Sequence, residues 1–223
     1  MLQLSERTLG DWLEHWAEVT PDKEYIVYSD RNLRFTWKQF NERVDHMAKG
    51  LLAIGVKKDT HVGIWARNVP DWLTFLYACA KIGAVAVTVN TNYKQAELEY
   101  LCENSDMHTL CIVDGEKDSN FVEMTYTMLP ELKLFERGHM KSKRFPHMRN
   151  VVYIGQEKYR GMYNTAEILL LVNSFSSFDC FGENDFFVVF NSRTFLLQFF
   201  HNSLLLIKMR SNLNIFLQCA KRE

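Results

Sequence analysis

Residues 62–90 read VGIWARNVPDWLTFLYACAKIGAVAVTVN, and this stretch decides the fold class. Two apolar runs, HVGIWA at 61–66 and AVAVTV at 84–89, lie on either side of a segment that is apolar on almost every face. Continuous apolar runs are typical of parallel strands that are covered on both faces. Two such strands joined by a helical crossover form a right-handed parallel unit. The stretch therefore predicts an α/β fold.

The segment between the two strands is predicted to form the most buried helix of the chain, over about 69–82. Its large side chains, which include Trp72, Phe75 and Leu76, are distributed around a helix with the usual period. A helix with one wet face would leave several of them unburied. We therefore expect Phe75 and Leu76 to be buried against the two strands.

Three of the predicted helices carry sequence signals for their first turn. These signals are the pairs Thr8 with Asp11, Thr36 with Gln39, and Asn68 with Asp71, together with Pro70. A side-chain oxygen at such a position accepts a hydrogen bond from a backbone N–H that the helix leaves free, and proline suits a first turn. Gly55 stands where a left-handed cap would end the second helix.

The same alternation of strands and helices extends on both sides of this unit. The further predicted elements are a helix from Leu9 to Val19, a hairpin of strands at 25–28 and 33–35, a helix whose buried stripe runs from Phe40 to Ile54, helices near 94–104 and 119–129, and strands at 109–113 and 150–154. This alternation indicates an α/β fold built from parallel units.

The character of the sequence changes at about residue 172. Residues 172–223 hold ten of the sixteen phenylalanines, one of the ten glycines, and neither proline nor tryptophan. No clear period runs through them, and turn residues are rare. We therefore divide the chain into an α/β domain at 1–171 and a divergent apolar tail at 172–223, which we expect to be poorly ordered. We interpret the tail as unselected sequence; a hydrophobic helical subdomain is the alternative.

The overall composition of the chain indicates no particular class of binding partner. The formal net charge is −1, with 47% apolar and 24% charged residues, as in an ordinary soluble globular protein. The five cysteines form no C-x-x-C pair, which favours free thiols in a reducing compartment. The first residues lack the pattern of a signal peptide, and no apolar run is long enough to span a bilayer. We therefore expect a cytoplasmic protein.

The sequence contains no familiar catalytic or metal-binding motif. G-x-G-x-x-G, G-x-x-x-x-G-K-[ST], G-x-S-x-G and H-E-x-x-H are all absent, and the seven histidines are scattered. The stretch at 133–149 carries six Lys or Arg against one Glu, which favours a solvated connector over a site for a polyphosphate, a coenzyme or RNA. Trp12, Trp16 and Trp72 have helical spacing, which is typical of core residues. We assign no catalytic, cofactor-binding or metal-ligating residue.

Residues 8 to about 171 resemble the N-terminal region of AMP-forming acyl-CoA synthetases, which belong to the adenylate-forming ligases. The matching segments include GVKKDTHVGIWARNVPDW at 55–72, KIGAVAVTVNTNY at 81–93, ELEYLCENSD at 97–106, RFPHMRNVVYIG at 144–155 and RGMYNTAEILLL at 160–171. The resemblance is collinear and covers about three-quarters of the chain. It implies the beginning of the N-terminal domain of the adenylate-forming ligase fold.

The resemblance also implies a reaction for the full-length family. Members use ATP and magnesium to convert a carboxylic acid, here a fatty acid, to an acyl-adenylate, and then transfer the acyl group to coenzyme A. Their phosphate-binding loop, Y-T-S-G-T-T-G-x-P-K, follows the region matched here. The tail at 172–223 contains a single glycine, Gly182, and no sequence that resembles this loop. The adenine-binding motif, the hinge and the catalytic lysine of the family also find no match.

We therefore expect a fragment of an acyl-CoA synthetase that is inactive alone and binds no cofactor of its own. Its sheet would be left incomplete at the edge, and exposed apolar surface would favour self-association. The alternative is a non-catalytic interaction module, or one half of a split enzyme, that pairs with a synthetase partner. We expect no nucleic-acid partner and no membrane span.

Overall fold

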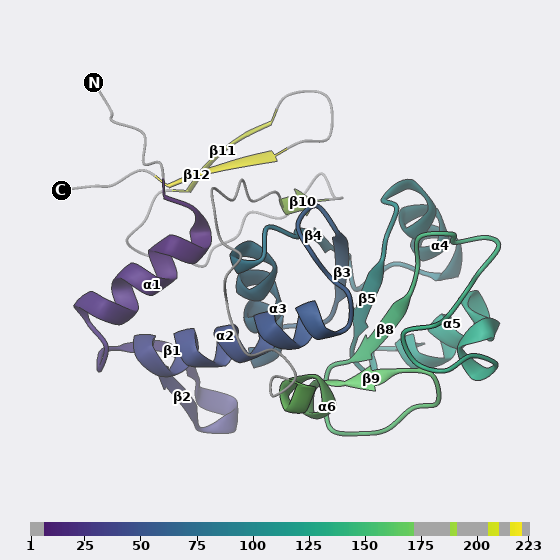
Figure 1. Ribbon diagram of the computed structural model, residues 1–223, viewed down its shortest axis with the longest axis horizontal. Helices are drawn as coiled ribbons and strands as arrows, with labels where there is room; N and C mark the ends of the chain where they lie inside the picture. The colour runs from purple at the N-terminus through teal and green to yellow at the C-terminus, as the bar shows by residue number, and fades with distance from the viewer. Residues whose placement is uncertain (1–6, 172–187, 191–204, 210–214, 220–223) are drawn as a thin grey trace.

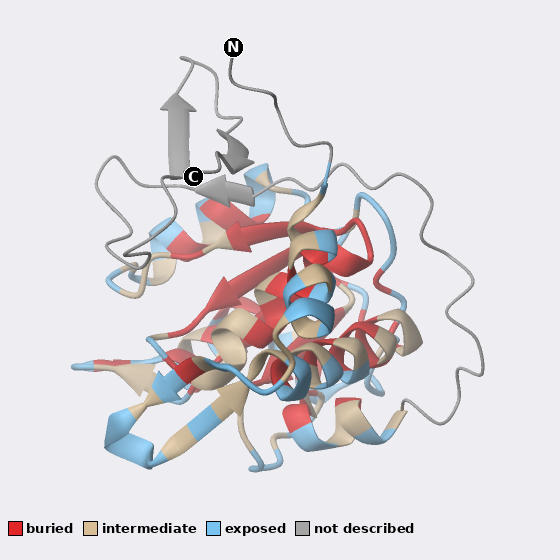
Figure 2. Cartoon of the chain, turned by 90° about the vertical axis from the view of Figure 1, so that its left-hand side faces the viewer, coloured by how far each residue is buried: buried red, intermediate tan, exposed pale blue. Residues whose placement is uncertain are grey.

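The computed structural model of the protein describes residues 7–171, 188–190, 205–209 and 215–219. A mostly parallel sheet crosses the molecule, with α1, α2 and α3 on one side and α4 and α5 on the other (Figure 1). The strands are buried along most of their length, whereas the helices carry exposed residues on their outer faces (Figure 2). This layered arrangement confirms the predicted α/β fold.

The main sheet has the strand order β11-β12-β10-β4-β3-β5-β8-β9. Its strands are β3 (His61–Trp65), β4 (Val85–Thr88), β5 (Thr109–Ile112), β8 (Asn150–Tyr153), β9 (Tyr163–Asn164), β10 (Val188–Phe190), β11 (Leu205–Met209) and β12 (Ile215–Cys219). From β10 to β9 all neighbours run parallel, and β11 and β12 are antiparallel. The central register places Gly63 between Val87 and Leu110. The predicted strands at 61–66, 84–89, 109–113 and 150–154 are therefore confirmed.

The helices and short elements surround this sheet. They are α1 (Leu9–Val19), α2 (Trp37–Ala53), α3 (Pro70–Lys81), α4 (Gln95–Asn104), α5 (Phe121–Met128), α6 (Thr165–Leu170), the 3-10 turns η1 (Ser29–Arg31) and η2 (Pro130–Lys133), and the antiparallel pairs β1 (Glu24–Tyr28) with β2 (Leu33–Thr36) and β6 (Gly115–Glu116) with β7 (Ser119–Asn120). The hairpin and the predicted helices up to residue 129 are confirmed. Helix α6, strand β9 and the pair of β6 and β7 were not predicted from the sequence.

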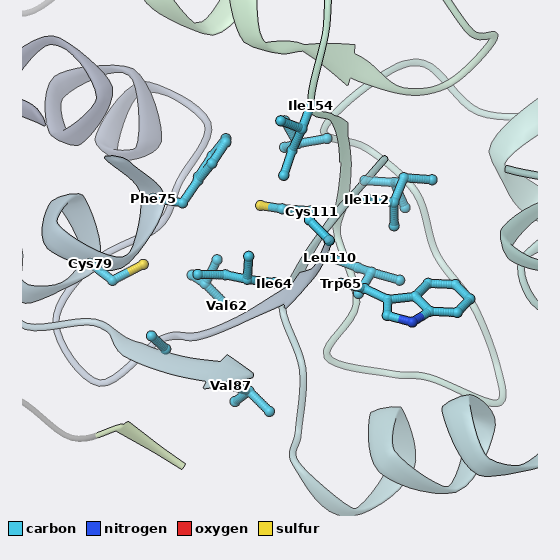
Figure 3. Close-up of a cluster of buried hydrophobic side chains, with 14 of the residues drawn as sticks. Val62, Ile64, Trp65, Phe75, Cys79, Val87, Leu110, Cys111, Ile112 and Ile154 are labelled. Carbon is cyan, nitrogen blue, oxygen red and sulfur yellow. The ribbon is translucent and has the colours of Figure 1, made fainter. Parts of the chain in front are cut away.

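Helix α3 confirms the parallel unit but is not covered on every face. Phe75 and Cys79 are fully buried, and both face the side of β5 where Cys111 also points (Figure 3). Leu76, which was expected to be buried, is only half-buried. Trp72 shares its face of the helix because the two residues are four apart, and it is half-buried as well. One stripe of α3 therefore remains partly open to solvent.

The predicted cap of α3 is wrong. The N-cap residue is Val69, and no side chain caps the helix. Asp71 instead forms an ion pair with Arg43 of α2, and the side chains are 18% and 29% exposed. A carboxylate beside a partly buried guanidinium gains more from a charge-assisted bond than from a neutral backbone N–H. Both other predicted capping boxes are present, at the starts of α1 and α2.

Lys81, at the end of α3, is a buried charge that the sequence analysis did not identify. Its side chain is 3% exposed. Its Nζ lies 2.7 Å from Glu14 Oε1, 2.8 Å from Asn41 Oδ1 and 2.5 Å from Asp45 Oδ1. Three acceptors satisfy the three protons of the ammonium group, which a buried charge requires. The lysine thereby fastens α1 and α2 to the end of α3.

The tryptophans expected in the core lie at its margin. Trp16 is 37% exposed, and Trp12 and Trp72 are half-buried. Trp16 contacts Trp37, which stacks on Tyr25 with ring centroids 3.7 Å apart. These three large indole rings belong to surface helices and cover the core from outside.

The three cysteines with described side chains, Cys79, Cys102 and Cys111, are buried free thiols, as predicted. Burial raises the pKa of the Cys79 and Cys102 thiols to about 12, so neither is a nucleophilic thiolate at neutral pH. The predicted disorder of 172–223 falls outside the described residues, apart from the backbone of β10, β11 and β12.

Across the described ranges, no helix combines the length and the apolar character that crossing a bilayer requires.

Candidate functional site

The carboxyl ends of β3 and β5 are the expected position of a ligand-binding site in this sheet. The chain passes from β3 to β4 on one side, and β5 then lies on the other side of β3. In open parallel sheets, ligands bind outside the carboxyl ends of the strands at such a reversal of strand order. Here the reversal lies between Trp65, the last residue of β3, and Ile112, the last residue of β5.

An ion pair closes the gap between these two strand ends. Arg67 Nη1 lies 2.8 Å from Asp114 Oδ1 and donates a second bond of 2.5 Å to the Gly115 carbonyl oxygen. The two side chains are 40% and 62% exposed, so water screens the pair. We call Arg67, Asp114 and Gly115 the switch-point clasp. It joins the loops that follow β3 and β5.

The clasp changes the acidity of its carboxylate. Partial burial alone would raise the pKa of Asp114. The hydrogen bond and charge of Arg67, with the backbone N–H groups of Gly115 and Asp114 itself, outweigh burial and hold that pKa below its ordinary value. Asp114 is therefore ionised at neutral pH and acts as the counter-ion of Arg67 rather than as a proton donor.

An aromatic floor lies beneath the clasp. Trp65 is fully buried and stacks on Phe121 of α5, with ring centroids 3.7 Å apart and planes 11° from parallel. Its indole Nε1 donates a 3.2 Å hydrogen bond to the Asn90 carbonyl oxygen beyond β4. Figure 3 shows Trp65 beside Leu110 and Ile112, on the face of the sheet away from Phe75. The floor thus connects three strand ends to α5.

The loop after β8 is fixed in a similar way. The Thr165 hydroxyl donates to the Tyr153 carbonyl oxygen at 3.4 Å and accepts from Gly155 N at 3.3 Å. Asn164 Nδ2 donates to the carbonyl oxygens of Gln156 and Glu157. The start of α6 therefore sets the position of the loop that leaves the sheet at β8.

The chemistry assembled at this edge is limited. Where the structure describes side chains, no three His, Cys, Asp or Glu residues converge in a way that could hold a metal ion. A hollow of about 390 Å³ lies elsewhere, lined by Phe35, Gln39, Glu42, Arg43, His46 and Leu169. The edge supplies a positioned guanidinium, a carboxylate and backbone groups. This end of the sheet can therefore form the wall of a binding site. That the chain carries no catalytic residue remains a prediction.

The histidines at the opposite edge of the sheet have structural partners. His61 Nδ1 bonds the Ser105 carbonyl oxygen, and His108 Nδ1 lies 2.9 Å from Thr109 Oγ1. Burial, helped by the positive charge of Arg149, lowers the pKa of His108.

The basic stretch at 133–149 is a connector, but it is packed rather than freely solvated. Met140, Phe145 and Met148 are buried. Arg144 forms two ion pairs of 2.6 Å with Glu99 and Glu103 of α4. The apolar residues that alternate with the charges in this stretch hold it against the body of the protein. The number of charges in this stretch indicated a freely solvated connector, whereas the alternating apolar residues give it a buried side.

Sequence reasoning missed Arg67 and Asp114. Both follow directly after strands that it predicted correctly, so the position after a parallel strand was the available signal. Nothing in the residues themselves shows that β5 lies next to β3, because the order of strands depends on tertiary packing.

Comparison with known proteins finds similarity to one family of enzymes. The family described as AMP-binding enzyme matches residues 13–154. A relative named "Putative acyl-CoA synthetase YngI", from Bacillus subtilis (strain 168), is 40% identical over 174 residues, covering 78% of this chain and 32% of that protein. The mitochondrial medium-chain acyl-CoA ligase ACSF2 of Bos taurus is 33% identical over 153 residues, or 69% and 25% of the two chains. The chain thus spans about a third or less of these relatives.

Solved structures share the fold at low sequence identity. A long-chain-fatty-acid-CoA ligase (FadD1) from Archaeoglobus fulgidus aligns with a TM-score of 0.60 and 21% identity, over 84% of this chain and 35% of that chain. The R395G mutant of coronafacic acid ligase from Pectobacterium brasiliense gives 0.63 and 17%, over 82% and 33%. These likenesses concern the fold alone.

Proposed function

The chain belongs to the AMP-binding enzyme family, and we propose that it supplies the first part of the N-terminal domain of an acyl-CoA synthetase that activates a fatty acid with ATP. The observation that carries this proposal is the family match over residues 13–154, which coincides with the parallel sheet from β3 to β8 and its covering helices. The names of the relatives support an acyl-CoA product and an apolar acid.

In this proposal the switch-point clasp has a positioning role. It fixes the loops after β3 and β5 at the edge where parallel sheets bind their ligands. The aromatic floor beneath it keeps those loops in register with α5. We therefore propose that this region is a rigid wall for a site completed by other residues.

We propose that the described residues do not by themselves form a site for ATP and magnesium. Arg67 directs one nitrogen to both Asp114 and the Gly115 carbonyl oxygen, which reduces its availability for a phosphate. In the described part of the chain, no three His, Cys, Asp or Glu side chains are grouped to hold a metal ion. We therefore propose that this chain does not adenylate an acid alone, and that coenzyme A, ATP and magnesium are bound only by a complete enzyme.

We predict no fatty-acid-dependent exchange between ATP and pyrophosphate for the purified chain. Adenylation needs donors aimed at the phosphates of ATP, both at the α-phosphate that is transferred and at the pyrophosphate that leaves, and no such set is assembled at the switch-point clasp. The measurement is incorporation of labelled pyrophosphate into ATP with medium-chain and long-chain fatty acids, beside an empty-vector preparation. Acid-dependent exchange clearly above that preparation would contradict the proposal that the chain is inactive alone.

A further inference from the structure

A chain of hydrogen bonds begins at the side chain of His108 and crosses the amino ends of β5 and β8. His108 Nδ1 lies 2.9 Å from Thr109 Oγ1, and the same oxygen accepts a 3.3 Å bond from Asn150 Nδ2. Asn150 Nδ2 also donates a 2.9 Å bond to the Ile54 carbonyl oxygen at the end of α2. Thr109 and Asn150 are buried, and His108 is half-buried. We call these four residues the amino-edge relay.

The bonds of the relay select one protonation state of its histidine. Because the Ile54 carbonyl oxygen can only accept, the Asn150 atom that faces it and Thr109 is the amide nitrogen. Thr109 Oγ1 therefore accepts from Asn150. The hydroxyl hydrogen of Thr109 is left to donate to His108 Nδ1, since no other acceptor for it occurs among the described residues. The relay is complete only when Nδ1 carries no proton, as in the neutral imidazole protonated on Nε2.

The groups that face His108 from neighbouring elements also disfavour a charged ring. Burial, together with the positive charges of Arg149 before β8 and Lys57 after α2, lowers the pKa of His108. The backbone N–H of His108 donates to the His61 carbonyl oxygen at the start of β3, but the His61 ring bonds the Ser105 carbonyl oxygen instead. Among the ion pairs of the described ranges, none includes His108.

We propose that the amino-edge relay is an acid-sensitive latch, which holds the amino ends of β5 and β8 to the end of α2 and opens when His108 takes up a proton from solvent. Protonation turns Nδ1 from an acceptor into a donor, so the Thr109 hydroxyl hydrogen loses its partner inside the core. A buried donor without a partner is costly, and Arg149 and Lys57 repel the new charge. This inference is independent of the proposed function.

The stability that the latch contributes falls toward acid pH. In the unfolded chain His108 has the ordinary pKa of a histidine, about 6.5, and in the folded protein its pKa is lower. The folded state therefore binds fewer protons than the unfolded state in this range. The contribution is fully present above the unfolded pKa and is lost as the pH falls through the folded pKa.

Urea unfolding of the full chain at about pH 7.5 and about pH 5.5, on either side of the ordinary histidine pKa, tests the latch. The proteins are the wild type, His108→Gln, which is uncharged at both pH values, and the control His139→Gln, at an exposed side chain of the connector. We expect the wild type and the His139 variant to lose the same amount of urea midpoint at acid pH, and His108→Gln to lose less. Hydrogen exchange at the acid pH should be faster in β8 of the wild type than in β8 of His108→Gln.

Two further measurements keep the latch falsifiable if His108→Gln does not fold. NMR titration of the wild-type imidazoles should show His108 titrating below about 6.5. Thr109→Val, which keeps the shape of the side chain but removes the hydroxyl, should lose less urea midpoint at acid pH than the wild type. The proposal is overturned by equal acid losses in the wild type and His108→Gln, by a His108 ring that titrates at or above the ordinary value, or by a Thr109→Val protein with the full wild-type acid loss.

Discussion

Replacing Phe75 by alanine is expected to lower the free energy of unfolding by about 3–5 kcal/mol. The Phe75 ring is fully buried between α3 and the sheet, in the central β3-α3-β4 unit. The substitution removes buried apolar area and leaves a cavity that the rigid strands cannot close. A loss of this size is a large fraction of the stability of a typical domain, which is about 5–15 kcal/mol.

Urea unfolding followed by circular dichroism measures this loss, with two alanine variants as controls. Leu76→Ala, next along the same helix but only half-buried, should cost less than Phe75→Ala. Leu170→Ala, at a side chain 72% exposed, should change stability by less than about 0.5 kcal/mol. If Phe75→Ala unfolds at the same urea concentration as Leu170→Ala, α3 does not pack as described.

Replacing Gly161 by alanine is expected to cost about 2–4 kcal/mol, more than backbone strain alone explains. Gly161 has a φ of +78°, in the left-handed region that disfavours alanine. A Cβ built there would also lie 1.9 Å from the Leu132 carbonyl oxygen. Because that oxygen belongs to the backbone of η2, relief of the clash requires the loop after β8 to move away from the connector.

Gly55→Ala isolates the contribution of strain. Gly55 has a φ of +88°, but nothing lies within 4 Å of the position of its Cβ. Its replacement should cost about 1 kcal/mol, and the difference between the two variants reports the clash. Thermal unfolding of both proteins measures it. Equal losses for Gly161→Ala and Gly55→Ala would show that the loop after β8 does not lie against Leu132.

The central sheet and its helices could be predicted because local signals agree there. The apolar runs at 61–66 and 84–89 are too continuous for surface strands, and the boxes at Thr8 and Thr36 mark helix starts. The predictions that failed concern residues whose partners are distant in the sequence. The sequence indicates a helix cap at Asp71, but in the structure Arg43 lies beside it. Lys81 stands at the end of a helix, where a lysine is usually exposed, but three acceptors from α1 and α2 surround it.

The switch-point clasp could not be predicted from the sequence for the same reason. Arg67 and Asp114 are 47 residues apart, and only the position of β5 next to β3 brings them together. Two-residue strands such as β9 carry too little pattern to be recognised, because a period needs several residues to show. Strand identity is thus largely a local property, whereas the candidate site is a property of strand order.

Exchange of the matched region into a relative tests the proposed function most directly. Residues 8–171 of this chain would replace the corresponding residues of the Bacillus subtilis relative, with which it shares 40% identity, and ATP–pyrophosphate exchange with fatty acids would be measured beside that parent protein. If this chain supplies the first part of an acyl-CoA synthetase domain, the chimera should retain acid-dependent exchange. A chimera that matches its parent in circular dichroism and melting temperature, yet shows no exchange while the parent does, would contradict the proposal.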